Sequence, residues 1–168
     1  MHLDMKPENI LVEGQRFAIA DFGVCRTTSR VDGIPDGTVP ANRVNSLQYR
    51  PLELLDMPSR SVQPSPRWDL WAFGRVAFEA TAWMSPSWRQ PGPMRRLFGG
   101  MQMKPVRAAE QGRDDRIRRH CPRALAPILF AAMPKSTPKS KSIRASELVL
   151  KLEALDTVAE YAAAEAVP

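Results

Sequence analysis

Residues 67–83, RWDLWAFGRVAFEATAW, form the most hydrophobic stretch of this 168-residue chain. On a helix, the apolar side chains of this stretch would cover most of the circumference, whereas a surface helix carries them in one stripe. We therefore expect residues 67–83 to form a buried helix in the core. A chain of this length can build a sizeable core within one domain.

The other elements are predicted from apolar periodicity and from Pro and Gly breaks. Two short apolar runs in residues 9–20 flank Glu13-Gly14-Gln15 and indicate a small β-hairpin. Polar residues, Gly and Pro dominate residues 24–46, which we expect to form a long exposed loop. Helices are predicted over residues 50–56, 67–83, 93–103, 122–133 and 145–164. The expected fold class is α+β, mostly α, with one small hairpin.

The net charge of +6 and the pI near 9.8 raise the question of a nucleic-acid partner. The basic residues are spread along the chain, and the densest stretch, residues 113–123, also contains Asp114 and Asp115. It lacks the interleaved aromatic residues of a single-strand binder. We expect a solvated basic face there, with nucleic-acid binding and phosphoprotein docking as the less favoured alternatives.

No apolar run reaches membrane-spanning length, and residues 1–9 are too polar for a signal peptide. The two cysteines, Cys25 and Cys121, lack metal-site spacing and are too few for a disulfide framework. Reduced thiols are the expected state. The protein is therefore predicted to be intracellular, cytoplasmic or nuclear, with no membrane partner.

Two polar motifs flank the predicted hairpin. The first comprises His2, Leu3, Asp4, Lys6 and Asn9, and the second is Asp21-Phe22-Gly23. Both motifs, in this order and around a hairpin, resemble the catalytic loop and the Asp-Phe-Gly motif of eukaryotic protein kinases. A Lys two positions after the Asp is the Ser/Thr pattern within that family.

The resemblance implies a role for each of these side chains in phosphoryl transfer from ATP. Asp4 would accept the proton of the substrate hydroxyl, and Lys6 would place positive charge by the moving phosphoryl group. Asn9 and Asp21 would be oxygen ligands of Mg²⁺, which bridges the nucleotide phosphates. Lys6, Asn9 and Asp21 are thus the expected cofactor-binding residues for ATP and Mg²⁺. Three further residues have implied structural or regulatory roles: His2, Phe22 and Gly23.

Residues 46–53, SLQYRPLE, resemble the end of a kinase activation segment, with a weak lean to the cyclin-dependent-kinase-like group from Tyr49-Arg50. Ser46 matches the threonine that helps to position the catalytic Asp. Glu53 matches a Glu that pairs with an Arg in the family. This chain places Lys141 at that Arg position, with Arg144 as an alternative, and a Lys would pair more weakly.

Asp69 begins the sequence DLWAFG, which resembles the start of the buried F helix of protein kinases. The resemblance implies that Asp69 hydrogen-bonds the backbone near His2. Leu3 stands where the family usually has an Arg that pairs with a phosphorylated loop residue. We therefore expect weak control by phosphorylation of the loop, although four residues remain as acceptors: Thr27, Thr28, Ser29 and Thr38.

The resemblance covers about residues 2–150 and only the C-terminal lobe of a kinase, so an N-terminal lobe is expected to be missing. We divide the chain into a partial protein kinase domain, 1–155, and the end of the last helix with a tail, 156–168. The favoured hypothesis is a truncated Ser/Thr protein kinase with ATP, a protein substrate and a regulatory protein as partners. The alternative is an inactive kinase-like binding or scaffold module, which three departures from the family pattern favour: Leu3, Leu52 and Lys141.

Overall fold

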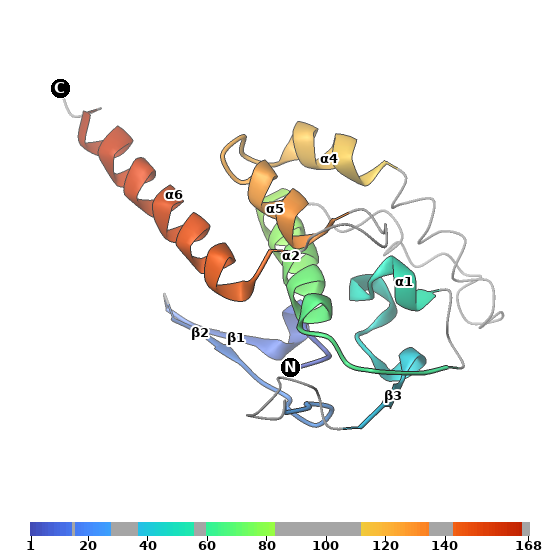
Figure 1. Ribbon diagram of the computed structural model, residues 1–168. Helices are drawn as coiled ribbons and strands as arrows, with labels where there is room; N and C mark the ends of the chain where they lie inside the picture. Colours follow the sequence, from blue (N-terminus) through green and yellow to red (C-terminus); the bar gives the residue numbers. More distant parts are fainter. Residues whose placement is uncertain (15, 28–36, 56–59, 83–111, 135–142, 166–168) are drawn as a thin grey trace, which may run out of the picture.

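The computed structural model describes residues 1–14, 16–27, 37–55, 60–82, 112–134 and 143–165, the last ten by their backbone only. Helices predominate, and two small antiparallel sheets lie beside them (Figure 1), which fits the predicted α+β, mostly helical class. Within these ranges, no helix is long and apolar enough to cross a membrane. The helix predicted over residues 93–103 lies outside the described residues.

Helix α2, Pro66–Ala82, runs through the middle of the described structure (Figure 1). No residue from Trp68 to Glu79 is exposed. Side chains of α2 enter all four hydrophobic clusters of the described structure, which explains why its apolar residues surround the helix: Trp71, Phe78, Trp68, Leu70, Phe73, Ala72 and Val76. The predicted core helix is confirmed, and it begins at a proline, a residue favoured in the first helical turn.

Helix α5, Ala126–Ala132, packs against α2 where α2 carries Gly74. A Cβ at position 74 would lie 2.7 Å from Met133 Cγ and 3.2 Å from Ala132 Cβ, so only glycine allows this approach. The helix predicted over residues 122–133 is confirmed, but it begins later because residues 123–125 form a turn.

Helix α6, Ala145–Glu165, confirms the predicted last helix. Its first turns pack on α5, where Leu148 shares a hydrophobic cluster with Ile128 and Ala132. Beyond this contact, α6 extends away from the rest of the chain (Figure 1). The proposed division at residue 155 falls within this continuous helix.

The predicted hairpin is confirmed as strands β1, Ile10–Glu13, and β2, Arg16–Ile19, paired antiparallel. Gly14 lies in the turn with φ of +60°, a conformation that glycine adopts without strain. At the open end, Ala20 N donates to Asn9 O at 2.9 Å. The hairpin thereby brings together the two polar motifs that precede and follow it.

A second sheet was not predicted. Strand β3, Val39–Pro40, pairs antiparallel with β4, Ser61–Val62, and links the polar stretch 37–46 to the start of α2. The expectation of a long exposed loop over residues 24–46 is wrong where β3 forms and where side chains between residues 39 and 45 are buried, but Asn42 and Arg43 are exposed as expected. Three small apolar residues among the polar ones are buried and anchor the segment: Val39, Ala41 and Val44. Residues 28–36 of this stretch lie outside the described residues.

The rest of this segment consists of short helical turns that lead to α2. The 3₁₀ turns η2, Ala41–Arg43, and η3, Leu47–Tyr49, precede helix α1, Leu52–Leu55. The helix predicted over residues 50–56 is thus confirmed as a single turn. A third 3₁₀ turn, η1, Pro7–Asn9, leads into the hairpin.

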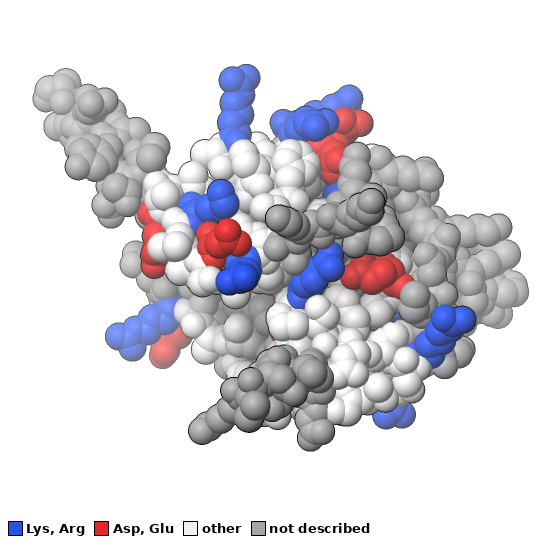
Figure 2. Space-filling view, in the orientation of Figure 1, with Lys and Arg blue, Asp and Glu red and all other residues white. Residues whose placement is uncertain are grey.

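Helix α4, Arg113–His120, lies in the stretch expected to be a solvated basic face. That expectation is wrong for Arg113, whose side chain is buried against Asp114 at 3.1 Å with its guanidinium carbon 5.1 Å from the Trp71 ring centroid. Arg118 and Arg119 are exposed as expected. Figure 2 shows Lys and Arg side chains scattered over the face in view and interspersed with Asp and Glu.

Candidate active site

Residues 2–9, the candidate catalytic loop, are held against the first turn of α2 by Asp69. Its two carboxylate oxygens accept hydrogen bonds from His2 N and Leu3 N, both at 2.7 Å. Leu3 has φ of +67°, a left-handed conformation that costs a non-glycine residue energy. The paired bonds to a charged acceptor offset that cost. They also fix the direction in which the side chain of the next residue, Asp4, projects from the loop.

The His2 ring connects this loop to the residues after the hairpin. Its Nδ1 accepts a hydrogen bond from Asp4 N at 3.3 Å, so Nε2 carries the proton and donates to Ala20 O at 2.9 Å. The same ring meets Phe22 edge-on, with centroids 5.2 Å apart. One buried imidazole thus sets the spacing between the loop and the Asp21-Phe22-Gly23 motif.

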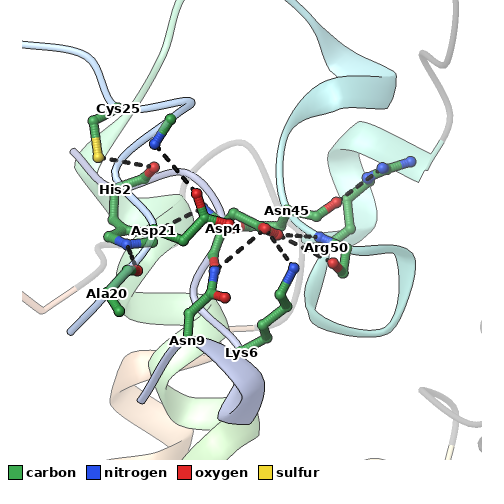
Figure 3. Close-up of polar contacts among 11 residues, drawn as sticks. His2, Asp4, Lys6, Asn9, Ala20, Asp21, Cys25, Asn45 and Arg50 are labelled. Carbon is green, nitrogen blue, oxygen red and sulfur yellow. Dashed lines mark hydrogen bonds and ion pairs between the residues drawn. The ribbon is translucent and has the colours of Figure 1, made fainter. Parts of the chain in front are cut away.

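The Asp4 carboxylate lies at the centre of the polar network in Figure 3. Lys6 Nζ lies 2.7 Å from Asp4 Oδ2, and Ser46 donates to Oδ1 from its backbone N–H at 3.0 Å and from Oγ at 3.1 Å. Burial raises the pKa of Asp4, but the bonds from Lys6 and Ser46 outweigh it and hold the pKa below its usual value. The carboxylate is therefore ionised near neutral pH.

The pKa of Lys6 moves in the opposite direction. Its hydrogen bond to Asp4 raises the pKa above the usual lysine value against a smaller effect of burial, and the charge of Asp21 adds to the rise. Lys6 stays charged, as a group that neutralises phosphate must.

Asn9 and Asp21 both lie at the open end of the hairpin. Asn9 donates Nδ2 to Asp4 O at 2.9 Å and, less directly, to Asp4 Oδ2 at 3.4 Å, so its Oδ1 faces away from Asp4. Asp21 follows directly on Ala20, the hairpin partner of Asn9, and is exposed. Amide and carboxylate oxygens are what Mg²⁺ prefers, so these two residues fit the metal.

No cluster of three or more His, Cys, Asp or Glu side chains that could hold a metal by itself occurs in the described ranges. Asn9 and Asp21 would therefore need phosphate oxygens or water to complete the coordination of Mg²⁺. Asp21 has φ of +62°, and within the described ranges its carboxylate accepts one long contact, 3.4 Å, from Gly23 N. Phe22 is 64% exposed. The motif presents its carboxylate outward, where a nucleotide could reach it.

Leu3, which stands at a position where the resemblance predicts an Arg, directs its side chain into an apolar cluster. The side chain is 1% exposed and packs among five other buried residues: Val39, Ala41, Val44, Leu54 and Trp68. Apolar contact with Leu3 therefore fixes the segment 39–44 beside the loop, without an ion pair.

The family model for the protein kinase domain matches residues 1–152. The chain belongs to the protein kinase family. A serine/threonine-protein kinase of Eremothecium gossypii, PKH3, is 37% identical over 81 residues, which are 47% of this chain and 11% of that protein. A death-associated protein kinase related protein of Drosophila melanogaster is 32% identical over 95 residues, or 51% of this chain and 12% of that protein. The kinase chain described here thus spans about a tenth of each relative.

Glu53 of the kinase domain lies half-buried in α1. Its first expected partner, Lys141, lies outside the described residues, so that pair stays a prediction. The second, Arg144, is exposed; its backbone N–H donates to Glu147 at 3.0 Å at the start of α6. No ion pair between Arg144 and Glu53 occurs in the described part of the chain.

Two residues of the candidate site were not nominated from the sequence, Asn45 and Arg50. Asn45 is buried with φ of +50° and donates its backbone N–H to Leu3 O at 2.6 Å. Arg50 donates to three backbone carbonyls of the segment 42–45. An Asn before the nominated Ser46 was the available signal, because Asn tolerates left-handed backbone better than most residues.

Proposed function

We propose that this protein transfers the terminal phosphoryl group of ATP to serine or threonine hydroxyls of a protein substrate. The observation that carries the proposal is the arrangement of Asp4, an ionised carboxylate with Lys6 on one oxygen and Ser46 on the other. A base, an adjacent fixed cation and a nearby pair of magnesium-type ligands are the parts that phosphoryl transfer to a hydroxyl requires.

In the proposed reaction, Asp4 Oδ2 accepts the hydroxyl proton of the substrate. Oδ1 is engaged by both donors of Ser46, whereas the one short contact of Oδ2 in the described structure is with Lys6. Lys6 stays beside the base and places its charge where negative charge gathers on the transferred group. Ser46 orients the carboxylate so that Oδ2 faces the incoming hydroxyl.

Asn9 Oδ1 and the Asp21 carboxylate would hold Mg²⁺. The bound ion neutralises charge on the phosphates of ATP and fixes their orientation. The contributions of the protein are to direct Asn9 by its bond to Asp4 O, and to direct Asp21 through the hairpin and the contact between His2 and Phe22. Gly23 and Glu53 are proposed to keep the structural or regulatory roles that the resemblance implies for them.

The finer parts of the proposal rest on sequence. Lys6 favours serine or threonine over tyrosine, and Tyr49-Arg50 favours a group similar to the cyclin-dependent kinases. The same proposal includes domain limits of 1–155, a regulatory protein as partner and an intracellular location. The name of the relative from Eremothecium gossypii, a serine/threonine-protein kinase, supports the serine/threonine assignment.

The test is a phosphorylation assay on the protein tagged in its native gene and purified from its native source. Asp4→Asn keeps the shape of the side chain and removes the base, so the rate should fall by about 10²–10⁴-fold. Asp115→Asn, in the exposed part of α4, should leave the rate unchanged. A rate equal in the parent and in Asp4→Asn would exclude Asp4 as the base.

One observation favours the alternative, an inactive kinase-like binding or scaffold module. Large apolar side chains are exposed on the hairpin and just after it, a feature of surfaces that contact other proteins: Leu11, Val12, Phe17, Ile19, Phe22 and Val24. Under this alternative the purified parent would transfer no phosphate, and Leu11→Ser would weaken its recovery with a partner protein.

A further inference from the structure

Asn45 connects three parts of the site that are distant in sequence. Its backbone N–H donates to Leu3 O in the candidate catalytic loop at 2.6 Å, and its side-chain Nδ2 donates to Trp68 O in α2 at 3.3 Å. Its own carbonyl accepts from Arg50 Nη2 at 2.9 Å (Figure 3). The residue is therefore fixed from three directions.

The conformation and burial of Asn45 are costly. Its φ of +50° lies in the left-handed region, and only 2% of the residue is exposed. Its Oδ1 is buried and has no hydrogen-bond partner in the described part of the chain. A buried acceptor left unpaired lowers stability and offsets part of what the bond from Nδ2 to Trp68 O contributes. Violations of this kind are expected where a residue serves function.

The position of Asn45 explains where the next residue points. Ser46 directs both its N–H and its Oγ to Asp4 Oδ1, while Asn45 bonds to Leu3, the residue before Asp4. Two consecutive residues of one segment thus meet two consecutive residues of the loop. Rotation of Asn45 into the usual φ range would turn the backbone at Ser46 and take its two donors away from Asp4.

Arg50 fixes the same segment from the other side. Its Nε donates to Val44 O at 2.8 Å and its Nη2 to Asn42 O at 2.8 Å, in addition to the bond to Asn45 O. Burial lowers the pKa of this guanidinium, which nevertheless remains charged. Three carbonyls bound by one planar group leave the segment 42–45 little freedom to rotate.

We propose that Asn45 is a positioning residue: its left-handed backbone sets where Ser46 meets the Asp4 carboxylate. The inference rests on the proposed function, because it gives Asn45 an effect on the rate of phosphoryl transfer. It also makes a purely structural claim, namely that the Ser46 N–H loses its hydrogen bond when position 45 leaves the left-handed region.

Two substitutions separate the backbone of Asn45 from its amide. Asn45→Gly loses the bond to Trp68 O but accepts positive φ without strain, whereas the β-branched Asn45→Val loses the same bond and resists positive φ. Asn42→Val is the matched control, because Asn42 is exposed in the same segment and contacts Arg50 through its carbonyl alone. Circular dichroism establishes that each variant folds.

The first measurement is hydrogen exchange at the Ser46 amide in this chain. Asn45→Val should lose protection there, while Asn45→Gly and Asn42→Val keep most of it. If Asn45→Val does not fold, Asn45→Ala replaces it, with the same expected direction. Protection at Ser46 that is equal in the parent and in the folded Val or Ala variant would overturn the proposal.

The second measurement is steady-state phosphorylation by the protein purified from its native source. Asn45→Val should lower kcat by about 10–100-fold with the KM for ATP unchanged, since a displacement of about 1 Å at the base can have that effect. Asn45→Gly should recover most of kcat. Adding Asn45→Val to Ser46→Ala should have less than its full separate effect, because Ser46→Ala has already removed one of the two Ser46 donors to Asp4 Oδ1.

These results separate the two proposals. A parent protein that transfers no phosphate contradicts the proposed function, while the exchange experiment still decides whether Asn45 holds Ser46 on Asp4. Loss of kcat that is equal in Asn45→Gly and Asn45→Val, or fully additive with Ser46→Ala, would overturn the role of the left-handed backbone.

Discussion

The ammonium of Lys6 lies 2.7 Å from a carboxylate oxygen of Asp4, and both side chains are about one-fifth exposed. The pair is therefore partly screened by water, unlike an ion pair in the core. Its hydrogen bond lowers the pKa of Asp4 and raises the pKa of Lys6. The candidate base and its neighbouring cation thus keep opposite charges over a wide pH range.

This relationship predicts a pH dependence for Lys6→Met. The pKa of Asp4 is lower in the folded than in the unfolded protein, so its contribution to stability is complete above the unfolded value of about 3.9 and is lost as the pH falls through the folded pKa. The raised pKa of Lys6 gives a contribution that is complete below about pH 10.4 and is lost as the pH rises through the folded value.

The free energy of unfolding of the parent should therefore exceed that of Lys6→Met by about 0.5–1 kcal/mol over the middle pH range. The difference should shrink as the pH falls below 4, in urea unfolding at a series of pH values. Lys151→Met, exposed on α6, is the control and should show no such profile. A difference that is the same at pH 3 and pH 7 would contradict the prediction.

Gly74→Val should destabilise the protein, because its Cβ would overlap Met133 where α2 and α5 approach most closely. Overpacking of a core costs about 1–3 kcal/mol. Ala80→Val is the control on the exposed side of the same helix and should cost only the helix propensity of valine, about 0.5 kcal/mol. Thermal unfolding measures both; equal shifts in Tm would mean that the helices can separate without cost.

Asp69→Asn should cost about 1.5–3 kcal/mol, because the carboxylate accepts two backbone N–H groups and an amide offers one acceptor and one donor. The new side-chain NH₂ group at position 69 would face a backbone N–H of His2 or Leu3, so two donors would oppose each other. Hydrogen exchange at the Leu3 amide should accelerate in this variant. Asp115→Asn, whose partner Arg118 is exposed, should be nearly neutral, and unchanged exchange at Leu3 would show that Asp69 does not hold the loop.

Thr38→Ala should change kcat less than twofold in the protein from its native source. Leu3 packs in an apolar cluster, so it offers no cation to a phosphate on the exposed Thr38. The segment 39–44 is fixed by buried apolar side chains whether or not Thr38 is modified. Asp4→Asn serves as the positive control for lost activity, and a large loss in Thr38→Ala would show that loop phosphorylation does control the enzyme.

Local patterns predicted much of this structure. Apolar side chains of residues 67–83 were expected to cover most of the helix circumference, and α2 contributes to four clusters of the described residues. The hairpin followed from two apolar runs and one glycine. The candidate site residues Asp4, Lys6 and Asn9 were nominated through a resemblance to the kinase catalytic loop, a motif that spans six positions here and can be read without the rest of the fold.

Features that depend on tertiary contact were missed. The pairing of Val39 with Val62 joins two-residue strands that have no periodicity to detect. Burial of Arg113 depends on Trp71, which is 42 positions away, and composition alone indicated an exposed cation. Asn45 and Arg50 hydrogen-bond to backbone carbonyls. Every residue type has a backbone carbonyl, so the sequence does not reveal these contacts.

Because α2 enters each hydrophobic cluster that the described residues form and carries Asp69 in its first turn, the geometry of the candidate catalytic loop depends on all four of these clusters. Few partial openings could release the loop while leaving α2 in place. The site should therefore belong to the last cooperative unit to open, in contrast to sites on independently opening lids. Inactivation on heating would then follow global unfolding rather than precede it.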